Sequence, residues 1–426
     1  MAADTNSVSV QARSRSERAS SIPRRAFGFG LAGLASTIMM IGASAPSPFY
    51  PHLQEQLGIG AFGVTIAFAV YAVALLIALL TVGSISDHLG RRPIIFIGYL
   101  LLAGAILLVW RADTGTMLYL GRSMQGIASG ALISTISATI VDFAPPHRPK
   151  AATLLNSIAP MTGLAVGTLY AGALLEAAGP AAATATFVPL AFAYLIVAAL
   201  IWATPETSPR EAGWRRALRP RVAVPRAAAR LFGISVPIIL AGWATGGLFL
   251  SLGPSIVHAE LRVNSSLAQG LVIGALPATG AIAAFVMRNR RPLVNAVYGA
   301  SALAVGTLLM LIALAVGSLP LYIVAVVIAG TGFGTAFSGT VGSIMPFAAV
   351  HERAELFASL YIVAYLSFGV PAVIAGALAS TIGLHTAVLA FGAGVALAAG
   401  IAAIIRARTG TPTTPPRTMR HLGPSS

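Results

Sequence analysis

The feature that most constrains this chain is a series of long apolar blocks separated by short polar loops. A helix needs roughly 20 apolar residues to cross the hydrocarbon core of a bilayer, and the blocks have about this length. They show no alternation of period two, which argues against a transmembrane β-barrel. Only 9% of the residues are Asp, Glu, Lys or Arg, too few to cover the water-facing surface of a soluble protein. The sequence therefore predicts an all-α integral membrane protein.

The blocks divide into six, a basic polar segment, and six more. The twelve spans are expected near 26–47, 62–82, 94–110, 117–141, 151–175, 181–203, 231–256, 268–287, 293–316, 320–347, 354–380 and 384–405. The predicted domains are a disordered cytoplasmic tail (1–25), an N-terminal six-helix bundle (26–203), a basic cytoplasmic linker (204–230), a C-terminal six-helix bundle (231–405) and a second disordered cytoplasmic tail (406–426).

The first block has a second interpretation. Arg24 and Arg25 precede it, and Ala43, Ser44 and Ala45 end it, so it imitates a twin-arginine export signal. Because many further spans follow and must insert in any case, we interpret it as a first transmembrane helix after a basic tail.

The positive charges are distributed unevenly over the loops. If both termini are cytoplasmic, only Arg111, Arg122 and Arg262 of the 27 Lys and Arg residues lie elsewhere, which leaves 24 on the cytoplasmic side. The excess of positive charge thus indicates topology rather than nucleic-acid binding. We expect a multi-pass protein of the bacterial inner cell membrane, with the seven arginines of 210–230 against lipid headgroups.

The two halves of the chain are alike. Leu118-Tyr119 opens the fourth block and is followed by Gly126 and Gly130, while Leu321-Tyr322 opens the tenth and is followed by Gly330 and Gly334. The repeat predicts two pseudo-symmetric six-helix bundles, with a substrate site between them near the middle of the membrane.

The loop between the second and third spans, 83–93, is the first chemical motif. Gly83 would allow close helix packing and Gly90 a left-handed turn, while Asp87 can pair with Arg91 or accept hydrogen bonds from a helix N-terminus. Arg92 follows as a second basic residue.

Arg122 is the one charged residue that the sequence places well inside a span. Its insertion costs at least about 2.5–3.5 kcal/mol, so a compensating role is expected. Gln125 lies three residues later, on the same helix face. Our hypothesis is that the two residues act as one unit facing a substrate cavity, with Gln125 sharing the guanidinium donors. The alternative is a structural arginine satisfied by backbone carbonyls and Gln125.

These motifs resemble those of the major facilitator superfamily. The loop 83–93 is similar to the superfamily's signature loop, although His88 stands where Arg is usual, and Arg122 followed by Gln125-Gly126 is similar to its second motif. The resemblance implies a twelve-helix carrier that works by alternating access. No resident cofactor is expected. The resemblance also implies that Arg122, Gln125 and Asn156 serve substrate binding or coupling.

The fifth span is similar to the superfamily's antiporter motif, in which Pro160 and Gly163 would bend and closely pack the helix, but Ala159 replaces the usual Gly. Asp87, Arg91 and Asp142 are predicted to form a charged cluster that holds the outward-facing state and must break for inward opening.

The expected substrate surface is aromatic. Trp243, Phe337, Tyr361 and Tyr365 are candidates to line an apolar cavity. No Asp or Glu lies in the middle of a span, so if protons are the coupling ion, the titrating group must lie at a rim.

The remaining chemistry is defined by exclusion. There is no Cys, no Gly-x4-Gly-Lys nucleotide loop and no acid or His cluster with metal-ligand spacing, so no enzyme, ATP-driven pump or metal site is predicted. We expect a monomeric secondary carrier that exports small organic or drug-like molecules. The alternatives are an uptake carrier for a small, anionic metabolite with Arg122 as counter-charge, and a non-transporting sensor on a carrier fold.

Overall fold

The structure, a computed structural model, describes residues 4–148 and 150–409, with the side chains of the first helix described from Arg24. Every regular element in these residues is helical. The long helices are α1 (Asp4–Ser44), α3 (Ala61–Val82), α5 (Arg91–Trp110), α6 (Gly115–Phe143), α7 (Lys150–Ala178), α8 (Ala182–Leu200), α10 (Arg226–Ala259), α11 (Ser266–Val286), α12 (Pro292–Ala315), α13 (Leu319–Ile344), α14 (Arg353–Ile382) and α15 (Leu384–Thr409). Three short helices lie between them: α2 (Tyr50–Leu57), α4 (Ser86–Leu89) and α9 (Trp214–Ala217).

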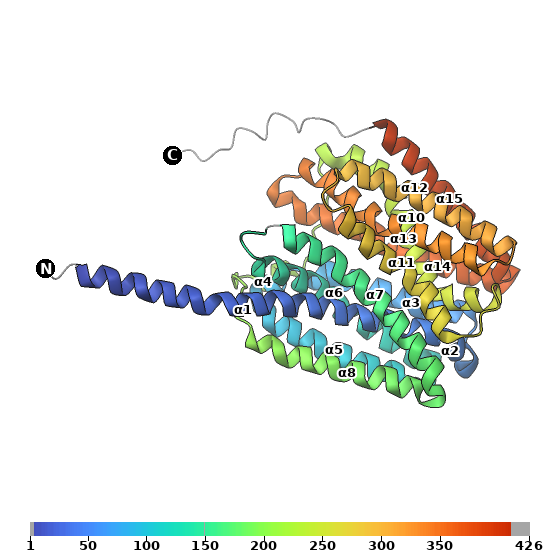
Figure 1. Ribbon diagram of the computed structural model, residues 1–426, viewed down its shortest axis with the longest axis horizontal. Coiled ribbons are helices and arrows are strands. Elements are labelled where there is room, and N and C mark those ends of the chain that lie inside the picture. The colour runs from blue at the N-terminus through green and yellow to red at the C-terminus, as the bar shows by residue number, and fades with distance from the viewer. Residues whose placement is uncertain (1–3, 149, 410–426) are drawn as a thin grey trace.

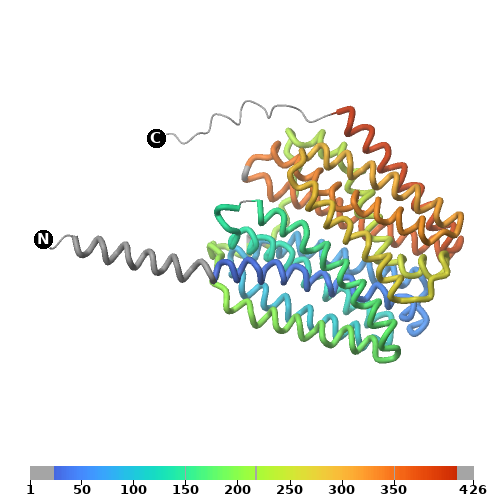
Figure 2. Tube along the Cα trace, viewed as in Figure 1, coloured from blue at the N-terminus to red at the C-terminus, as the bar shows by residue number. Residues whose placement is uncertain are grey.

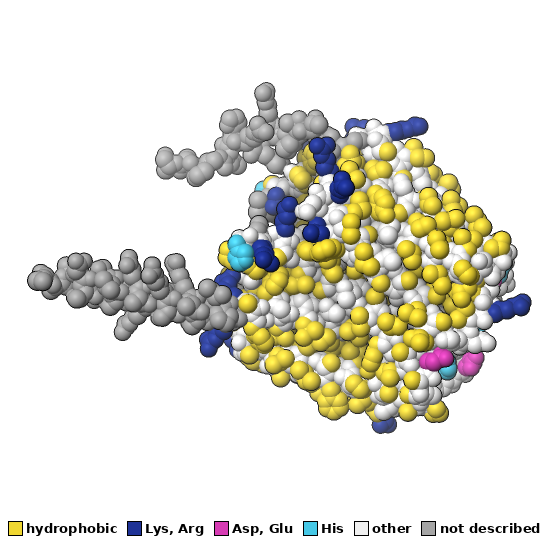
Figure 3. Space-filling model, in the orientation of Figure 1, with side chains coloured by type: hydrophobic (Ala, Val, Ile, Leu, Met, Phe, Trp, Pro, Cys, Tyr) yellow, Lys and Arg dark blue, Asp and Glu magenta, His cyan; other side chains and the backbone are white. Residues whose placement is uncertain are grey.

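These helices have the length and surface of membrane spans. Eleven helical stretches are long and apolar enough to cross a bilayer, and one of them, 150–203, contains both α7 and α8, which makes twelve spans in the described residues. Large apolar side chains are exposed along them, for example Ile282 at 63% and Leu397 at 65%. Figure 3 shows this apolar surface over the middle of the molecule, with Lys and Arg gathered mainly at one end. The predicted all-α membrane fold is confirmed.

The helices pack as two similar halves, α1–α8 (the N-half) and α10–α15 (the C-half), which lie side by side in Figures 1 and 2. In the N-half α3 and α5 pack on α6, α1 on α7, and α5 on α8. The C-half repeats each pairing in the same order, because α11 and α12 pack on α13, α10 on α14, and α12 on α15. The halves meet through two equivalent pairs, α7 with α11 and α3 with α14.

Glycines confirm the internal repeat at the level of backbone contact. A Cβ on Gly126 or Gly130 of α6 would lie 2.4 Å from a backbone carbonyl oxygen of α3. A Cβ on Gly330 of α13 would lie 2.5 Å from the Leu276 carbonyl oxygen of α11, and Gly334 meets the Gly280 carbonyl oxygen even more closely. The same glycine pair therefore allows equivalent helices to touch in each half.

The two ends of the molecule differ. We call the end with loop 83–93 and the connecting segment 204–225 the signature end, and the opposite end the distal end. At the distal end α7 and α11 are in backbone contact, since a Cβ on Gly172 would lie 2.6 Å from the Ser266 carbonyl oxygen. A Cβ on Gly376 of α14 would collide in the same way with the Thr65 side chain of α3. Both pairs that join the halves are thus closed at the distal end.

Three boundaries differ from the expectation. Helix α1 begins at Asp4, within the stretch 1–25 expected to be disordered, where Pro23 is the only proline and glycine is absent. Helix α10 begins at Arg226, four residues before the expected end of the linker. Helix α15 continues to Thr409, so Arg406, expected in the tail, is helical and fully buried. The rest of the second tail, 410–426, lies outside the described residues.

Candidate functional site

A cavity of about 820 Å³ lies between the two halves at the signature end. Helices α3 and α6 form its N-half wall, α14 forms its C-half wall, and the connecting segment covers part of its mouth. Its apolar and small polar lining consists of Leu79, Leu80, Gly83, Ser84, Ile133, Ser134, Ser137, Ala138, Val141, Ala212, Gly213, Ala354, Phe357, Ala358 and Tyr361. The Asp, Glu, Arg and His side chains of the lining come from loop 83–93 and the connecting segment: Asp87, His88, Arg91, Glu211, Arg219 and Arg221. The cavity therefore offers an apolar interior behind a charged entrance.

The four aromatic residues singled out from the sequence lie together beside this cavity. Tyr361 is on the wall, and its ring centroid is 6.0 Å from those of both Tyr365 and Phe337. Trp243 is packed behind them, 4.9 Å from Tyr365 and 5.6 Å from Phe337. Phe357, which the sequence analysis missed, extends the stack along the wall. Of the four predicted residues, one is at the surface of the cavity and three support it.

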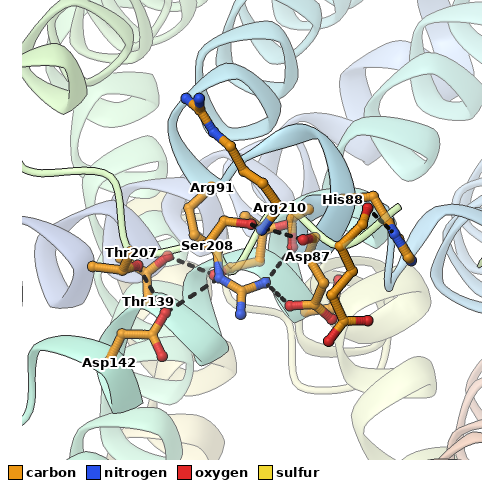
Figure 4. Close-up of polar contacts among 12 residues, drawn as sticks. Asp87, His88, Arg91, Thr139, Asp142, Thr207, Ser208 and Arg210 are labelled. Carbon is orange, nitrogen blue, oxygen red and sulfur yellow. Dashed lines mark hydrogen bonds and ion pairs between the residues drawn. The ribbon is translucent and has the colours of Figure 1, made fainter. Parts of the chain in front are cut away.

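The predicted charged cluster is present at the cavity mouth, and Figure 4 shows Arg91 between the side chains of Asp87 and Asp142. An Arg91 guanidinium nitrogen lies 2.5 Å from the Asp87 carboxylate, and Nε lies 3.3 Å from Asp142 Oδ2. Arg91 also donates to the Ser86 hydroxyl at 2.6 Å, and only 10% of its side chain is exposed. One nearly buried arginine therefore links α4, α5 and α6.

The connecting segment packs directly against this cluster. Thr207 donates its hydroxyl proton to Asp142 Oδ2 at 2.8 Å, and Ser208 donates to the backbone carbonyl of Asp87 at 2.9 Å. The His88 ring nitrogen Nδ1 lies 2.7 Å from the Glu211 carbonyl oxygen, to which it donates. Part of the segment expected to be a solvated basic linker is instead an ordered strap across the signature loop, and its Arg219 and Arg221 line the cavity.

Glu206 caps the N-terminus of α5. Its carboxylate accepts from the backbone N–H groups of Arg91 at 2.8 Å and Arg92 at 3.2 Å, as well as from Thr207 and Ser208. Burial on its own would raise the pKa of Glu206, but these four backbone donors outweigh it and lower the pKa below its ordinary value. The carboxylate is therefore held in its charged form at the positive end of the α5 dipole.

The cluster does not bridge the two halves. Asp87, Arg91 and Asp142 all belong to the N-half, and their contacts are intact although the cavity is open beside them. Opening at this end thus does not require the three residues to separate. The assignment of the cluster to an outward-facing latch stays a prediction, and any latch action needs a further partner in the C-half.

The other residues of the signature loop have distinct surroundings. Gly90 has φ +111°, which a side chain would strain, as the sequence predicted. Gly83 makes no close approach to another helix, since a Cβ there would lie at an ordinary 3.5 Å from the Ser134 hydroxyl. Arg92 donates to the Trp202 carbonyl at 3.0 Å and its guanidinium lies over the Trp202 ring, so it holds the turn after α8 (Ile201–Ala203) to α5.

Arg122 and Gln125 form a single buried unit inside the N-half. An Arg122 guanidinium nitrogen donates to Gln125 Oε1 at 2.5 Å, and Gln125 in turn donates to the Gly42 carbonyl at 2.7 Å. The guanidinium also lies 4.4 Å from the centre of the Tyr71 ring. Both side chains are 0% exposed, and neither is part of the cavity lining. The predicted pairing is present, whereas contact with a substrate stays a prediction.

The fifth-span motif serves helix packing. A Cβ on Gly163 would collide with the Thr37 carbonyl oxygen of α1, so this position requires a glycine. Helix α7 continues through Pro160 without interruption. Asn156 donates to the Ser137 carbonyl of α6 at 3.3 Å, close to the cavity wall. Within residues 4–148 and 150–409, no group of three or more His, Asp or Glu side chains is placed to hold a metal ion.

The comparisons with known proteins agree with this architecture. Residues 32–345 match the family described as Major Facilitator Superfamily. A bacterial homologue of the human lysosomal transporter Spinster, solved in an inward-facing and unoccupied conformation, has a TM-score of 0.69 with 16% identity, over 90% of this chain and 97% of that one. The human organic anion transporter MFSD10 (TETRAN) has a TM-score of 0.66 with 16% identity, over 89% and 99%.

A shorter match is found to curated relatives. Multidrug resistance protein MdtL of Salmonella schwarzengrund is 34% identical over 109 residues, and that of Salmonella paratyphi A is 33% identical over the same length. The match covers 25% of this chain and 28% of the relatives, so it spans about a quarter of their length. Since the family match extends over most of the chain, the chain belongs to the Major Facilitator Superfamily.

Proposed function

We propose that this transporter is a secondary carrier that exports small organic or drug-like molecules by alternating access. The observation that carries the proposal is the cavity between the halves, with an apolar interior, an aromatic wall at Phe357 and Tyr361, and a volume of about 820 Å³. Sites for drug-sized ligands are concave, largely apolar and of roughly 300–1,000 Å³, so the cavity has the size and chemistry for such a molecule.

The two ends of the molecule support alternating access. The cavity is open at the signature end, while glycine contacts close both inter-half pairs at the distal end. We assign the signature end, and with it both termini, to the cytoplasm of a bacterial cell, because 24 of the 27 Lys and Arg residues then lie on that side. A substrate would thus enter the cavity from the cytoplasm, as export requires.

The export direction draws its support from sequence. The multidrug resistance relatives match over 109 residues, and α7 carries Pro160 and Gly163 in a partial antiporter motif. Protons are the candidate coupling ion. Described acids lie at helix ends or in loops, so a coupling carboxylate would act at a rim of the protein rather than at its centre.

A second candidate, uptake of a small anionic metabolite, is favoured by one observation. Arg219 and Arg221 of the connecting segment line the cavity mouth and would attract a negatively charged ligand. They stand at the entrance, however, while the aromatic residues form the interior wall, so the export of apolar organic molecules is the better-supported function.

Flux in proteoliposomes tests the proposal. The purified protein is reconstituted, a pH gradient is imposed, and the movement of a lipophilic aromatic cation and of an organic anion is followed. Net movement of the aromatic compound in the direction opposite to the flow of protons supports export by exchange. Movement of the anion together with protons would support the uptake candidate, and no protein-dependent flux of any compound would favour a sensor. Monomeric behaviour and lipid binding can be measured on the same preparation.

A further inference from the structure

At the distal end a carboxylate of one half is bonded to a helix terminus of the other. Glu176, in the last turn of α7, accepts from the backbone N–H of Ser266 at 2.7 Å and from that of Leu267 at 3.4 Å. Helix α7 belongs to the N-half, and both donors belong to the first turn of α11 in the C-half. The bond therefore joins the two bodies that alternating access must move apart.

The N-terminus of α11 is capped in two complementary ways. The Ser265 hydroxyl accepts from the Ala268 N–H at 3.2 Å, which is the local N-cap bond. The Glu176 carboxylate accepts from the N–H groups of Ser266 and Leu267, the two residues before Ala268. The first N–H groups of a helix have no partner within the helix, and its N-terminus favours a negative charge. Two of these groups thus have a protein acceptor only while the halves are in contact at this end.

The geometry of this contact is set by two glycines. Gly172 lies four residues before Glu176 on α7, and Gly270 lies four residues after Ser266 on α11. A Cβ on Gly172 would be 2.6 Å from the Ser266 carbonyl oxygen, and a Cβ on Gly270 would be 2.6 Å from the Thr168 carbonyl oxygen. Because the backbones touch at both glycines, the Glu176 carboxylate, one turn further along α7, is placed over the start of α11.

We propose that Glu176 is the latch of the distal gate: its carboxylate holds α7 to the N-terminus of α11 while the cavity is open at the signature end, and it releases α11 when the distal end opens. The latch rests on the proposed alternating-access function. It acts by stabilising one of two conformations, and it touches no substrate. Its loss shifts the equilibrium toward the distal-open conformation.

Cysteine labelling measures this equilibrium directly, because the chain has no Cys of its own. Thr168 lies in the contact between α7 and α11 and is 0% exposed, so Thr168→Cys reports opening at the distal end. In sealed vesicles, with a membrane-impermeant maleimide added on the distal side, we expect Glu176→Gln to raise the labelling rate about three- to tenfold.

A second variant removes a donor instead of the charge on the acceptor. Ser266 is the first residue of α11, where proline is tolerated, and Ser265 before it is extended with φ −69° and ψ 118°, as a residue preceding proline must be. Ser266→Pro therefore deletes the N–H at 2.7 Å without breaking the helix, and it should raise labelling to a similar extent. The double variant should label little faster than the faster single one, because both changes act on the same contact.

The matched control is Glu55→Gln, which removes another exposed carboxylate of the distal end, on α2, and should leave the rate unchanged. Labelling within twofold of the parent in both Glu176→Gln and Ser266→Pro would overturn the latch. So would additive effects in the double variant, or an equal rise in Glu55→Gln. Labelling needs no substrate, so a failure of the latch is distinguishable from a failure of the export proposal, which would show only in the flux assay.

Discussion

The signature end and the distal end use the same chemical contact for different purposes. At each end a glutamate carboxylate caps the N-terminus of a long helix: Glu206 on α5 and Glu176 on α11. Glu206 and α5 both belong to the N-half and its strap, whereas Glu176 and α11 belong to opposite halves. The contact is therefore internal to one moving body at the signature end and spans two at the distal end.

The difference explains why one end is open and the other closed. The charged cluster around Arg91 is complete at the signature end, and yet the cavity opens beside it. At the distal end the carboxylate, the glycine contacts of α7 with α11, and the bond from the Ser47 hydroxyl to the Leu250 carbonyl at 2.7 Å all cross between the halves. A network controls a conformational change only if its members move relative to one another.

The largest expected effect is that of Gly172→Ala. The new methyl group would lie 2.6 Å from the Ser266 carbonyl oxygen, a backbone atom that moves only if α11 moves. Overpacking of this kind typically costs about 1–3 kcal/mol, here only in the distal-closed conformation. We expect distal labelling of Thr168→Cys to rise more than tenfold and transport to fall by a similar factor.

The control for this variant is Gly394→Ala in α15, where a Cβ would meet nothing within 4 Å. That change should leave labelling and flux unchanged. If Gly172→Ala behaves like Gly394→Ala, the distal closure does not depend on backbone contact between α7 and α11.

The second largest effect is expected from substitutions of Arg122, which lies at neither end of the molecule. Arg122→Lys keeps the charge but loses the planar fork that reaches Gln125, so we expect normal expression with flux reduced about tenfold. Arg122→Ala should transport equally poorly. Flux and membrane expression are measured together, because poor insertion of Arg122→Ala with normal flux in Arg122→Lys would mean that the arginine is structural.

A smaller effect is expected from Asp87→Asn at the signature end. It weakens one of the two carboxylate contacts of Arg91 while Asp142 retains the other. On the prediction that the cluster acts on a conformational step through a further partner in the C-half, kcat should fall about fivefold with KM changed less than twofold. Distal labelling should not change. Equal changes in kcat and KM would contradict this role.

Much of the fold was predictable because a bilayer imposes a length on each helix. The twelve spans, the repeat of Gly126 and Gly130 in Gly330 and Gly334, and the left-handed turn at Gly90 all follow from local sequence. The bond between Arg122 and Gln125 also follows from their spacing on one helix. Each of these features depends on residues close together in the chain or on the length that the bilayer requires of a helix.

The contacts of Glu176 and Glu206 were not predictable in this way. Each carboxylate binds backbone N–H groups of a segment 90 or more residues away. Because every residue except proline carries a backbone N–H, the sequence does not indicate which residues are the donors. The surroundings of Arg122 were only partly predictable for a related reason. Its spacing indicates the bond to Gln125, but the Tyr71 ring and the Ala43 carbonyl come from other helices.

The smallest expected effect is that of Glu206→Gln, and it depends on pH. A neutral cap on α5 should lower stability by about 0.5–1 kcal/mol, the lower part of the range for N-caps, because the site is partly exposed. The pKa of Glu206 is lowered in the folded protein, so the charged cap contributes fully above the ordinary carboxyl pKa of 4.5 and is lost as pH falls through the lower folded value. Thermal unfolding in detergent should therefore show a Tm lower by about 1–3 °C at pH 7 for the variant, with the difference shrinking below pH 4. Distal labelling of Glu206→Gln should match the parent protein, because this cap does not cross between the halves. A rise like that expected for Glu176→Gln would show that both ends respond as one, and that the contrast between an internal cap and a bridging cap is wrong.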